Sequence, residues 1–287
     1  MLFKELETAI ALAWKAGDAV RKFYALEIVA EQKIGIDNFA EPVTEADREA
    51  SRIIVEGLFD AFPKDAVLSE EEIDRTERRL SKDRVWIVDP IDGTAGFIKM
   101  DGDFAVQIGL AEHGEAVLGA VYMPATDVLY YAARGEGSFK SVKGGPAEKL
   151  EVSDKTDFRE MSLAVSRNHR SPKMSKIVRD LGLRNEIQRG SVGVKVGLIA
   201  ERVCDLYIHL SPRTKFWDTC GPQVILEEAG GKLTDLFGDK IRYNTSDVQN
   251  LNGILASNGA AHELAVNALK PILREFGRVK VTAAGKR

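Results

Sequence analysis

A short stretch in the first third of the chain combines two carboxylates with a glycine turn. Asp89 and Asp92 lie three residues apart after the apolar run Val85–Val88, and Gly93–Thr94 follow at once. We expect Pro90 to end the strand, because proline has no N–H for a strand ladder. Carboxylate oxygens suit hard cations such as Mg²⁺, and glycine lets a backbone N–H approach an anion closely. A metal and a phosphate could therefore meet within one turn.

The composition describes an ordinary globular protein and excludes several function classes. The 287 residues are enough for two domains, and 40 basic against 44 acidic residues give a net charge of −4. This balance argues against binding to a nucleic acid polymer or a membrane surface. We find no signal peptide at the N-terminus, and no 18-residue apolar window. The two cysteines form no disulfide framework, so a cytoplasmic location is expected.

The first half of the chain predicts helices followed by antiparallel strands. Apolar residues at helical spacing predict helices over 2–25 and 44–61, the second with Thr44 as N-cap. A short strand is expected at 66–69 and a charged loop at 72–84. Three β-rich runs read as consecutive antiparallel strands, at 104–112, 115–123 and 128–134. Residues 134–150 are expected to form a linker or a surface hairpin, which puts a domain boundary near residue 145.

The second half alternates strands with helices, which favours a layered α/β domain over 146–287. The expected strands are 161–165, 186–188, 205–210, 232–235 and 254–257. The expected helices are 172–182, 191–202, 219–230 and 260–276.

Four further polar residues carry little information singly. Glu70 stands in a run of three acidic residues, which is typical of a solvent-exposed surface. Asp47 is expected in the first turn of a helix, where its charge would complement the helix dipole. Asp218 opens a helix, as a capping residue does. Lys195 follows Ser191 in a glycine-rich helix start and, taken alone, is interpreted as a surface lysine.

Together these residues form an ordered set of motifs. VTEAD, SEE, DPIDGT, WD and EAGG follow one another between the first helix and about Asn258. This order resembles the inositol monophosphatase superfamily of metal-dependent phosphomonoesterases. The resemblance implies a layered α-β-α-β-α sandwich of the inositol monophosphatase and fructose-1,6-bisphosphatase type. It implies an α+β domain over 1–145 that carries most metal ligands and an α/β domain over 146–287 that carries Asp218.

The resemblance also implies a role for individual residues. Two or three Mg²⁺ ions would be held by Glu70, Asp89, the carbonyl of Ile91, Asp92 and Asp218. Glu70 would position the metal that carries the attacking water, Thr94 would hydrogen-bond that water, and Asp47 would accept from Thr94. The metals would offset the charge of the phosphate ester and lower the pKa of a bound water, without a phosphoenzyme. The implied substrate contacts are Asp92, Gly93, Thr94, Ser166, His169, Ser191, Lys195 and Asp218.

The substrate is less strongly indicated than the reaction. The segments around SRNH and GSVGVK look most like bacterial 3′(2′),5′-bisphosphate nucleotidases, so adenosine 3′,5′-bisphosphate is the leading substrate. His209 stands where those enzymes often have an arginine, which weakens this case. Arg213 and Lys215 could supply the missing charge or be exposed loop residues. The stretch EEAGGKLTD resembles inositol monophosphatases, so inositol monophosphate and fructose 1,6-bisphosphate stay open.

The remaining expectations concern partners and regulation. The protein would act on a small phosphorylated substrate as a monomer or homodimer, and superfamily members are commonly inhibited by Li⁺. A binding protein that kept the fold without catalysis is a further alternative, against which the intact carboxylates argue. Cys220, two residues after Asp218, is expected to be a packing residue or, if accessible, an oxidation-sensitive thiol.

Overall fold

The computed structural model describes residues 2–26, 28–167 and 171–282, and its largest element is a seven-stranded sheet. The strands lie in chain order: β3 (Ala66–Ser69), β4 (Arg84–Asp92), β5 (Ala105–Glu112), β6 (Glu115–Met123), β7 (Val128–Ala133), β8 (Gly137–Val142) and β9 (Glu148–Lys149). β3 and β4 pair in parallel, and every later neighbour pairs antiparallel. The three predicted antiparallel runs are therefore confirmed as β5, β6 and β7.

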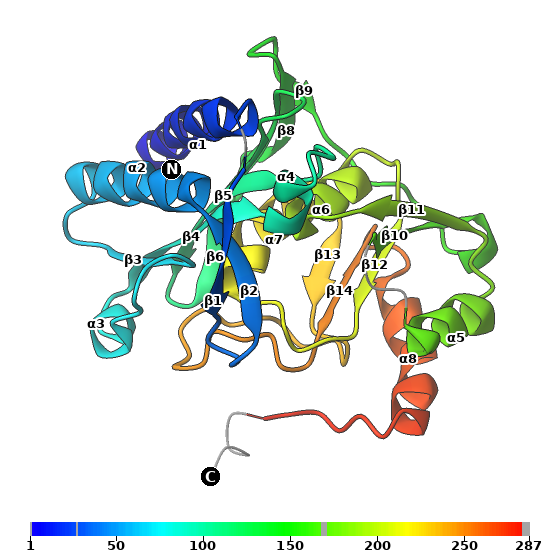
Figure 1. Cartoon of the computed structure of the whole chain (residues 1–287). Helices are drawn as coiled ribbons and strands as arrows, with labels where there is room; N and C mark the ends of the chain where they lie inside the picture. The colour runs from blue at the N-terminus through cyan, green and yellow to red at the C-terminus, as the bar shows by residue number, and fades with distance from the viewer. Residues whose placement is uncertain (1, 27, 168–170, 283–287) are drawn as a thin grey trace.

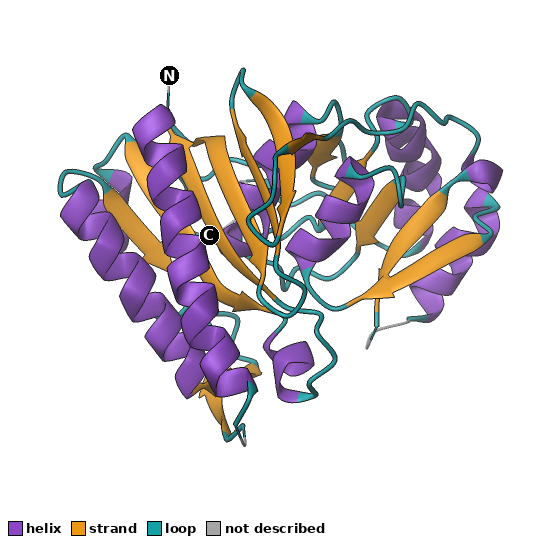
Figure 2. Ribbon diagram, turned by 90° about the horizontal axis from the view of Figure 1, so that it is seen from above, coloured by secondary structure: helices purple, strands orange, loops and turns teal. Residues whose placement is uncertain are grey.

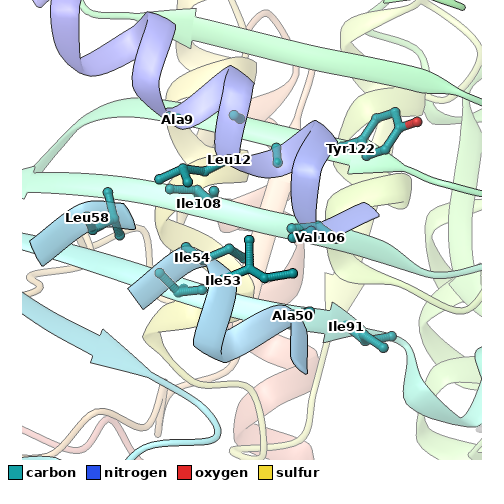
Figure 3. Close-up of a cluster of buried hydrophobic side chains, with 14 of the residues drawn as sticks. Ala9, Leu12, Ala50, Ile53, Ile54, Leu58, Ile91, Val106, Ile108 and Tyr122 are labelled. Carbon is teal, nitrogen blue, oxygen red and sulfur yellow. The ribbon is translucent and has the colours of Figure 1, made fainter. Parts of the chain in front are cut away.

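Two long helices cover one face of this sheet. α1 (Phe3–Tyr24) and α2 (Glu45–Ala61) pack against each other and against β4, β5 and β6. Figure 3 shows Ala9, Leu12, Ile53, Ile54 and Leu58 of the helices facing Val106 and Ile108 of the sheet. Strands β4 to β6 are apolar almost throughout because both of their faces are covered.

A second sheet of five strands lies beyond the first, with the order β11-β10-β12-β14-β13 (Figure 1). Its strands are β10 (Ser162–Ser166), β11 (Asn185–Arg189), β12 (Leu206–His209), β13 (Lys232–Thr234) and β14 (Ile254–Ser257). One face packs against α5 (Pro172–Leu181) and α8 (His262–Glu275), and the other against α6 (Val192–Ala200).

The central layer of helices joins the two sheets. α7 (Phe216–Glu228) lies on the face of the large sheet opposite α1 and α2, beside α6. The view from above shows the resulting sequence of helices, sheet, helices, sheet and helices (Figure 2). The predicted α-β-α-β-α sandwich is thus confirmed.

Helix α7 approaches the large sheet unusually closely at glycines. A Cβ placed on Gly119 of β6 would lie 2.1 Å from the carbonyl oxygen of Gly221. A Cβ on Gly109 of β5 would lie 2.7 Å from both Gly221 N and the Cys220 sulfur. Only residues without a side chain allow the helix backbone to rest on the strands at this depth.

Several local expectations need correction. A hairpin of β1 (Ala30–Ile34) and β2 (Ala40–Thr44) was not foreseen, because its residues are mostly polar and exposed. The predicted loop 72–84 contains a short helix, α3 (Thr76–Leu80), fastened by the ion pair of buried Arg79 with Asp74. Residues 134–150 form β8 and β9, so the hairpin alternative is right. A short helix, α4 (Thr94–Ile98), and a 3₁₀ turn (Phe158–Glu160) complete the elements.

The large sheet uses residues up to Lys149, and the small sheet begins at Ser162. The division into domains near residue 145 stays a prediction. No helix in the described ranges is both long enough and apolar enough to cross a membrane.

Candidate active site

The end of β4 places the two aspartates of the DPIDGT stretch. Contrary to the prediction, Pro90 does not end the strand, which continues to Asp92. The pairing with β5 instead shifts register between Asp89 and Asp92, which is how a strand accommodates a residue without an N–H. Both side chains lie almost fully buried, on the same edge of the sheet. Gly93 then turns the chain with a φ of 95°, and α4 begins at Thr94.

The first turn of α7 adds a third carboxylate. The helix begins at Phe216, three residues before the predicted start, so Asp218 lies inside its first turn. The backbone N–H of Lys215 donates to Asp218 Oδ2 at 2.5 Å. One oxygen each of Asp89, Asp92 and Asp218 lies within 4.8 Å of the other two. Carboxylates from two elements far apart in the sequence therefore form one cluster.

Hydrogen bonds from β5 and from the start of α6 fix the orientation of Asp92. Its Oδ2 accepts from Gln107 Nε2 at 2.6 Å, from the backbone N–H of Gly193 at 2.9 Å, and from the hydroxyl of Ser191. Ser191 is also the N-cap of α6 and accepts from Val194 N. These three donors all bind the same oxygen, Oδ2.

The same cluster contains a buried oxygen without a donor. Asp89 Oδ1 has no hydrogen-bond partner among the described residues, although a buried carboxylate oxygen ordinarily has one. Burial raises the pKa of Asp89 well above its usual range, and the charges of Glu70, Asp92 and Asp218 raise it further. Burial likewise raises the pKa of Asp92 and Asp218. A divalent cation would satisfy these oxygens and offset their repulsion, so the residues present fit Mg²⁺.

Glu70 lies beside the cluster but has a different partner in this structure. Its backbone N–H donates to Val88 O at 3.1 Å, which sets it next to Asp89. Its carboxylate pairs with Lys33 of β1 at 3.0 Å, and Lys33 also contacts Glu71. Burial raises the pKa of Glu70, and the Lys33 ammonium opposes this rise. The predicted role of Glu70 as a metal ligand stays a prediction.

Thr94 and Asp47 are within reach of each other. Thr94 Oγ1 lies 3.3 Å from Asp47 Oδ1 and 3.1 Å from the carbonyl oxygen of Ile91. Asp47 Oδ2 accepts from the N–H and the hydroxyl of Thr44, at 2.7 and 2.6 Å, in the capping box of α2. Burial raises the pKa of Asp47, while these Thr44 donors lower it. The helix cap thus holds one oxygen and directs the other at Thr94.

Two adjoining cavities surround these groups. The first, about 500 Å³, is lined on one side by Glu70, Asp89, Asp92, Gly93, Thr94 and Asp218, and on the other by residues of β2, β12 and the segment before α7. The second, about 160 Å³, has a mostly apolar wall that includes Val165, Met174, Ile208 and Leu210. His209 and Ser211 line both cavities, so the two cavities are adjacent.

The predicted substrate contacts are distributed unevenly over these cavities. Ser166 and Arg167 line the second cavity, and Arg167 is paired with Asp101 and Asp103. His169 lies outside the described residues. Ser191 and Lys195 line neither cavity, and Ser191 contacts Asp92 instead.

Lys195 is buried, which contradicts its reading as a surface lysine. Its ammonium donates to the carbonyl oxygen of Gly190 at 2.8 Å and lies 4.9 Å from the ring centre of Tyr207. Burial lowers the pKa of Lys195 to about 8, while Asp92 and Asp218 oppose this change.

Some participants were missed by the sequence reasoning. Gln107 was read only as part of a strand, although a glutamine within the apolar run FAVQIGLAE signals a buried polar contact. Lys33 and Glu41 lie on the unforeseen hairpin. Cys220 is fully buried and burial raises the pKa of its thiol, in keeping with the packing reading.

Comparisons with known proteins match this arrangement. The model of the inositol monophosphatase family matches residues 2–274. The 3′(2′),5′-bisphosphate nucleotidase CysQ of Salmonella typhimurium is 38% identical over 240 residues, which is 83% of this chain and 93% of that protein. The enzyme of the same name from Escherichia coli K12 is 35% identical over 244 residues, with the same coverage.

Two solved structures show the same fold. CysQ of Bacteroides thetaiotaomicron superposes with a TM-score of 0.75 at 31% identity, over 89% of this chain and 97% of that one. The IMPase of Thermotoga maritima superposes with a TM-score of 0.79 at 28% identity, over 95% and 99%. With the family model spanning almost the whole chain and a cluster that could hold a metal, the chain belongs to the inositol monophosphatase family and is a metal-dependent phosphomonoesterase.

Proposed function

We propose that this enzyme hydrolyses the 3′-phosphate of adenosine 3′,5′-bisphosphate. The observation that carries the proposal is the second cavity, which shares His209 and Ser211 with the cavity of the carboxylate cluster. Its mostly apolar wall suits a nucleobase, whereas an inositol phosphate has no group that needs such a wall. The similarity to CysQ proteins, which are named bisphosphate nucleotidases, supports the same substrate.

We propose that Asp89, Asp92, Asp218 and Glu70, with the carbonyl of Ile91, hold two or three Mg²⁺ ions. Bound Mg²⁺ offsets the charge of the phosphate ester and lowers the pKa of water. Backbone donors to Asp92 Oδ2 and Asp218 Oδ2 fix the orientation of both carboxylates, as hydrogen bonds to metal ligands do. Lys33 contacts Glu70 through Oε1, at 3.0 Å. Li⁺ inhibition is proposed by family analogy.

The proton path follows from the hydroxyl of Thr94. When Thr94 donates to Asp47 Oδ1, its oxygen lone pairs can accept a hydrogen bond from the attacking water. Asp47, whose burial raises its pKa, is a suitable final acceptor for that proton. The first backbone N–H groups of α4, which have no intrahelical acceptor, would hold the phosphate oxygens.

The test is phosphate release with Mg²⁺ from adenosine 3′,5′-bisphosphate, inositol 1-phosphate and fructose 1,6-bisphosphate, compared by kcat/KM. We expect the nucleotide to be preferred by about tenfold or more, which corresponds to about 1.4 kcal/mol. A preference for either of the other substrates refutes the nucleotidase assignment.

A variant tests the metal site independently of the substrate. Asp89→Asn removes a charge from the cluster, and we expect turnover to fall by several orders of magnitude with the fold retained. Mg²⁺ titration by calorimetry gives a second readout, in which the variant should release less heat and bind more weakly. Near-normal activity of this variant would overturn the ligand assignment.

A further inference from the structure

The wall of the first cavity that β2 and the segment before α7 form carries two cations and the carboxylate of Glu41. Arg213 and Lys215, from the segment between β12 and α7, line this wall. They face two acidic residues of the β1–β2 hairpin, Asp37 and Glu41. The two cations are held very differently by these carboxylates.

The ammonium group of Lys215 is engaged in ion pairs within the protein. Its side chain is 5% exposed, and its ammonium lies 2.6 Å from Glu41 Oε1 and 3.4 Å from Asp37 Oδ2. Such a buried, short ion pair fastens the hairpin to the segment that carries Asp218. Lys215 therefore has a structural partner and little capacity for a ligand.

Arg213 is held loosely. Its guanidinium lies 3.5 Å from Asp37 Oδ2 and 3.8 Å from Glu41 Oε1, and the side chain is 43% exposed. Among the described residues, the guanidinium donates no hydrogen bond of ordinary length. Arginine carries five N–H donors in a planar fork that matches a phosphate group. Arg213 thus presents unused donors to the cavity.

An aromatic ring holds this guanidinium in place. The Arg213 guanidinium carbon lies 4.6 Å from the ring centre of Phe39, at the turn of the hairpin. Stacking fixes the plane of the guanidinium and leaves its edge, where the N–H groups are, free to bind. The backbone N–H of Arg213 donates to Ser211 Oγ at 3.2 Å, which fixes the segment beneath it.

We infer that Arg213, stacked on Phe39, binds the second, non-reacting phosphate of a bisphosphate substrate. For adenosine 3′,5′-bisphosphate this is the 5′-phosphate. The inference rests on the proposed function and assigns a specificity residue to it. In this arrangement the reacting phosphate lies at the carboxylate cluster and the second phosphate lies at Arg213.

The experiment compares adenosine 3′,5′-bisphosphate with adenosine 3′-monophosphate in the wild type and in Arg213→Gln. The loss of charge-assisted hydrogen bonds should raise the KM for the bisphosphate about tenfold. The kcat, and both constants for the monophosphate, should stay within about twofold. Arg213→Lys keeps the charge but not the fork, and should give an intermediate KM.

Inhibition by the product gives a second readout. Hydrolysis leaves adenosine 5′-monophosphate, which retains the second phosphate, so Arg213→Gln should weaken inhibition by this product but not by adenosine. The matched control is Arg202→Gln, another exposed arginine, which is paired with Glu151 and lines neither cavity. The control should behave as the wild type.

The two proposals fail in distinguishable ways. A wild type that prefers the nucleotides, with the same bisphosphate KM in Arg213→Gln, refutes the Arg213 site and leaves the proposed function intact. A wild type that gains nothing from the 5′-phosphate also refutes the Arg213 site. A wild type that prefers inositol 1-phosphate refutes the proposed function and this inference with it.

Discussion

The carboxylate cluster predicts that removing a charge stabilises the metal-free protein. Asp89 has two carboxylate neighbours within 4.8 Å. Two unit charges at that separation repel by about 3.5 kcal/mol at an effective dielectric constant of 20, so Asp89→Asn would relieve about 7 kcal/mol if all three were ionised. Their raised pKa values show that proton uptake already relieves part of this repulsion.

We therefore expect a net gain of about 2 kcal/mol, or roughly 5 °C in Tm for a chain of this size. The assay is thermal unfolding of wild type and Asp89→Asn in EDTA and in saturating Mg²⁺. In EDTA the variant should melt higher. In Mg²⁺ the order should reverse, because binding at a hundredfold excess over Kd stabilises the wild type by about 2.7 kcal/mol.

The matched control for this experiment is Asp154→Asn, an exposed loop aspartate outside any ion pair of the described residues. It should leave Tm unchanged in both buffers. If Asp89→Asn melts at or below the wild type in EDTA, the surroundings of Asp89 stabilise its charge, and the reasoning about repulsion is wrong.

Three further predictions concern Thr94, Ser191 and His262. Thr94→Val removes the hydroxyl near Asp47 and should lower kcat by about 10²-fold at an unchanged Mg²⁺ requirement, measured by steady-state kinetics. Ser191→Ala removes a donor to Asp92 and should raise the half-saturating Mg²⁺ concentration about tenfold, measured by Mg²⁺ titration of the activity. Burial lowers the pKa of His262 to about 4, whereas in the unfolded chain it is about 6.5. The unfolded state therefore binds more protons between these values, so stability is complete above pH 6.5 and falls by about 3 kcal/mol toward pH 4. His262→Gln should flatten this dependence in urea titrations.

The sequence was most informative where the determinants are local. The turn at Gly93 and the Thr44–Asp47 cap are encoded by neighbouring residues, and both are present in the structure, although β4 continues through Pro90. Strands β5 to β7 were recognisable because burial on both faces gives continuous apolar runs.

What could not be foreseen depends on contacts between distant residues. The hairpin carrying Lys33 is polar and exposed, and its partners are Glu70 and the segment before α7. Gln107 approaches Asp92 only because β5 pairs with β4. Ser191 reaches Asp92 across 99 residues of sequence because α6 begins beside the end of β4. Periodicity within one element contains no information about such pairs.

Through the contact between Gly119 and Gly221, strand β6 helps to set the geometry of the metal centre, although it carries none of the proposed metal ligands. A methyl group on Gly119 would have to move about 1.3 Å from its 2.1 Å approach to reach an ordinary contact of 3.4 Å. Metal–ligand distances tolerate only about 0.2 Å. Because α7 carries Asp218, a larger side chain on β6 would change the distance of Asp218 from Asp89 and Asp92. Every ligand residue would still be present in the sequence. Inspection of the ligand motifs alone would then rate an inactive relative as active.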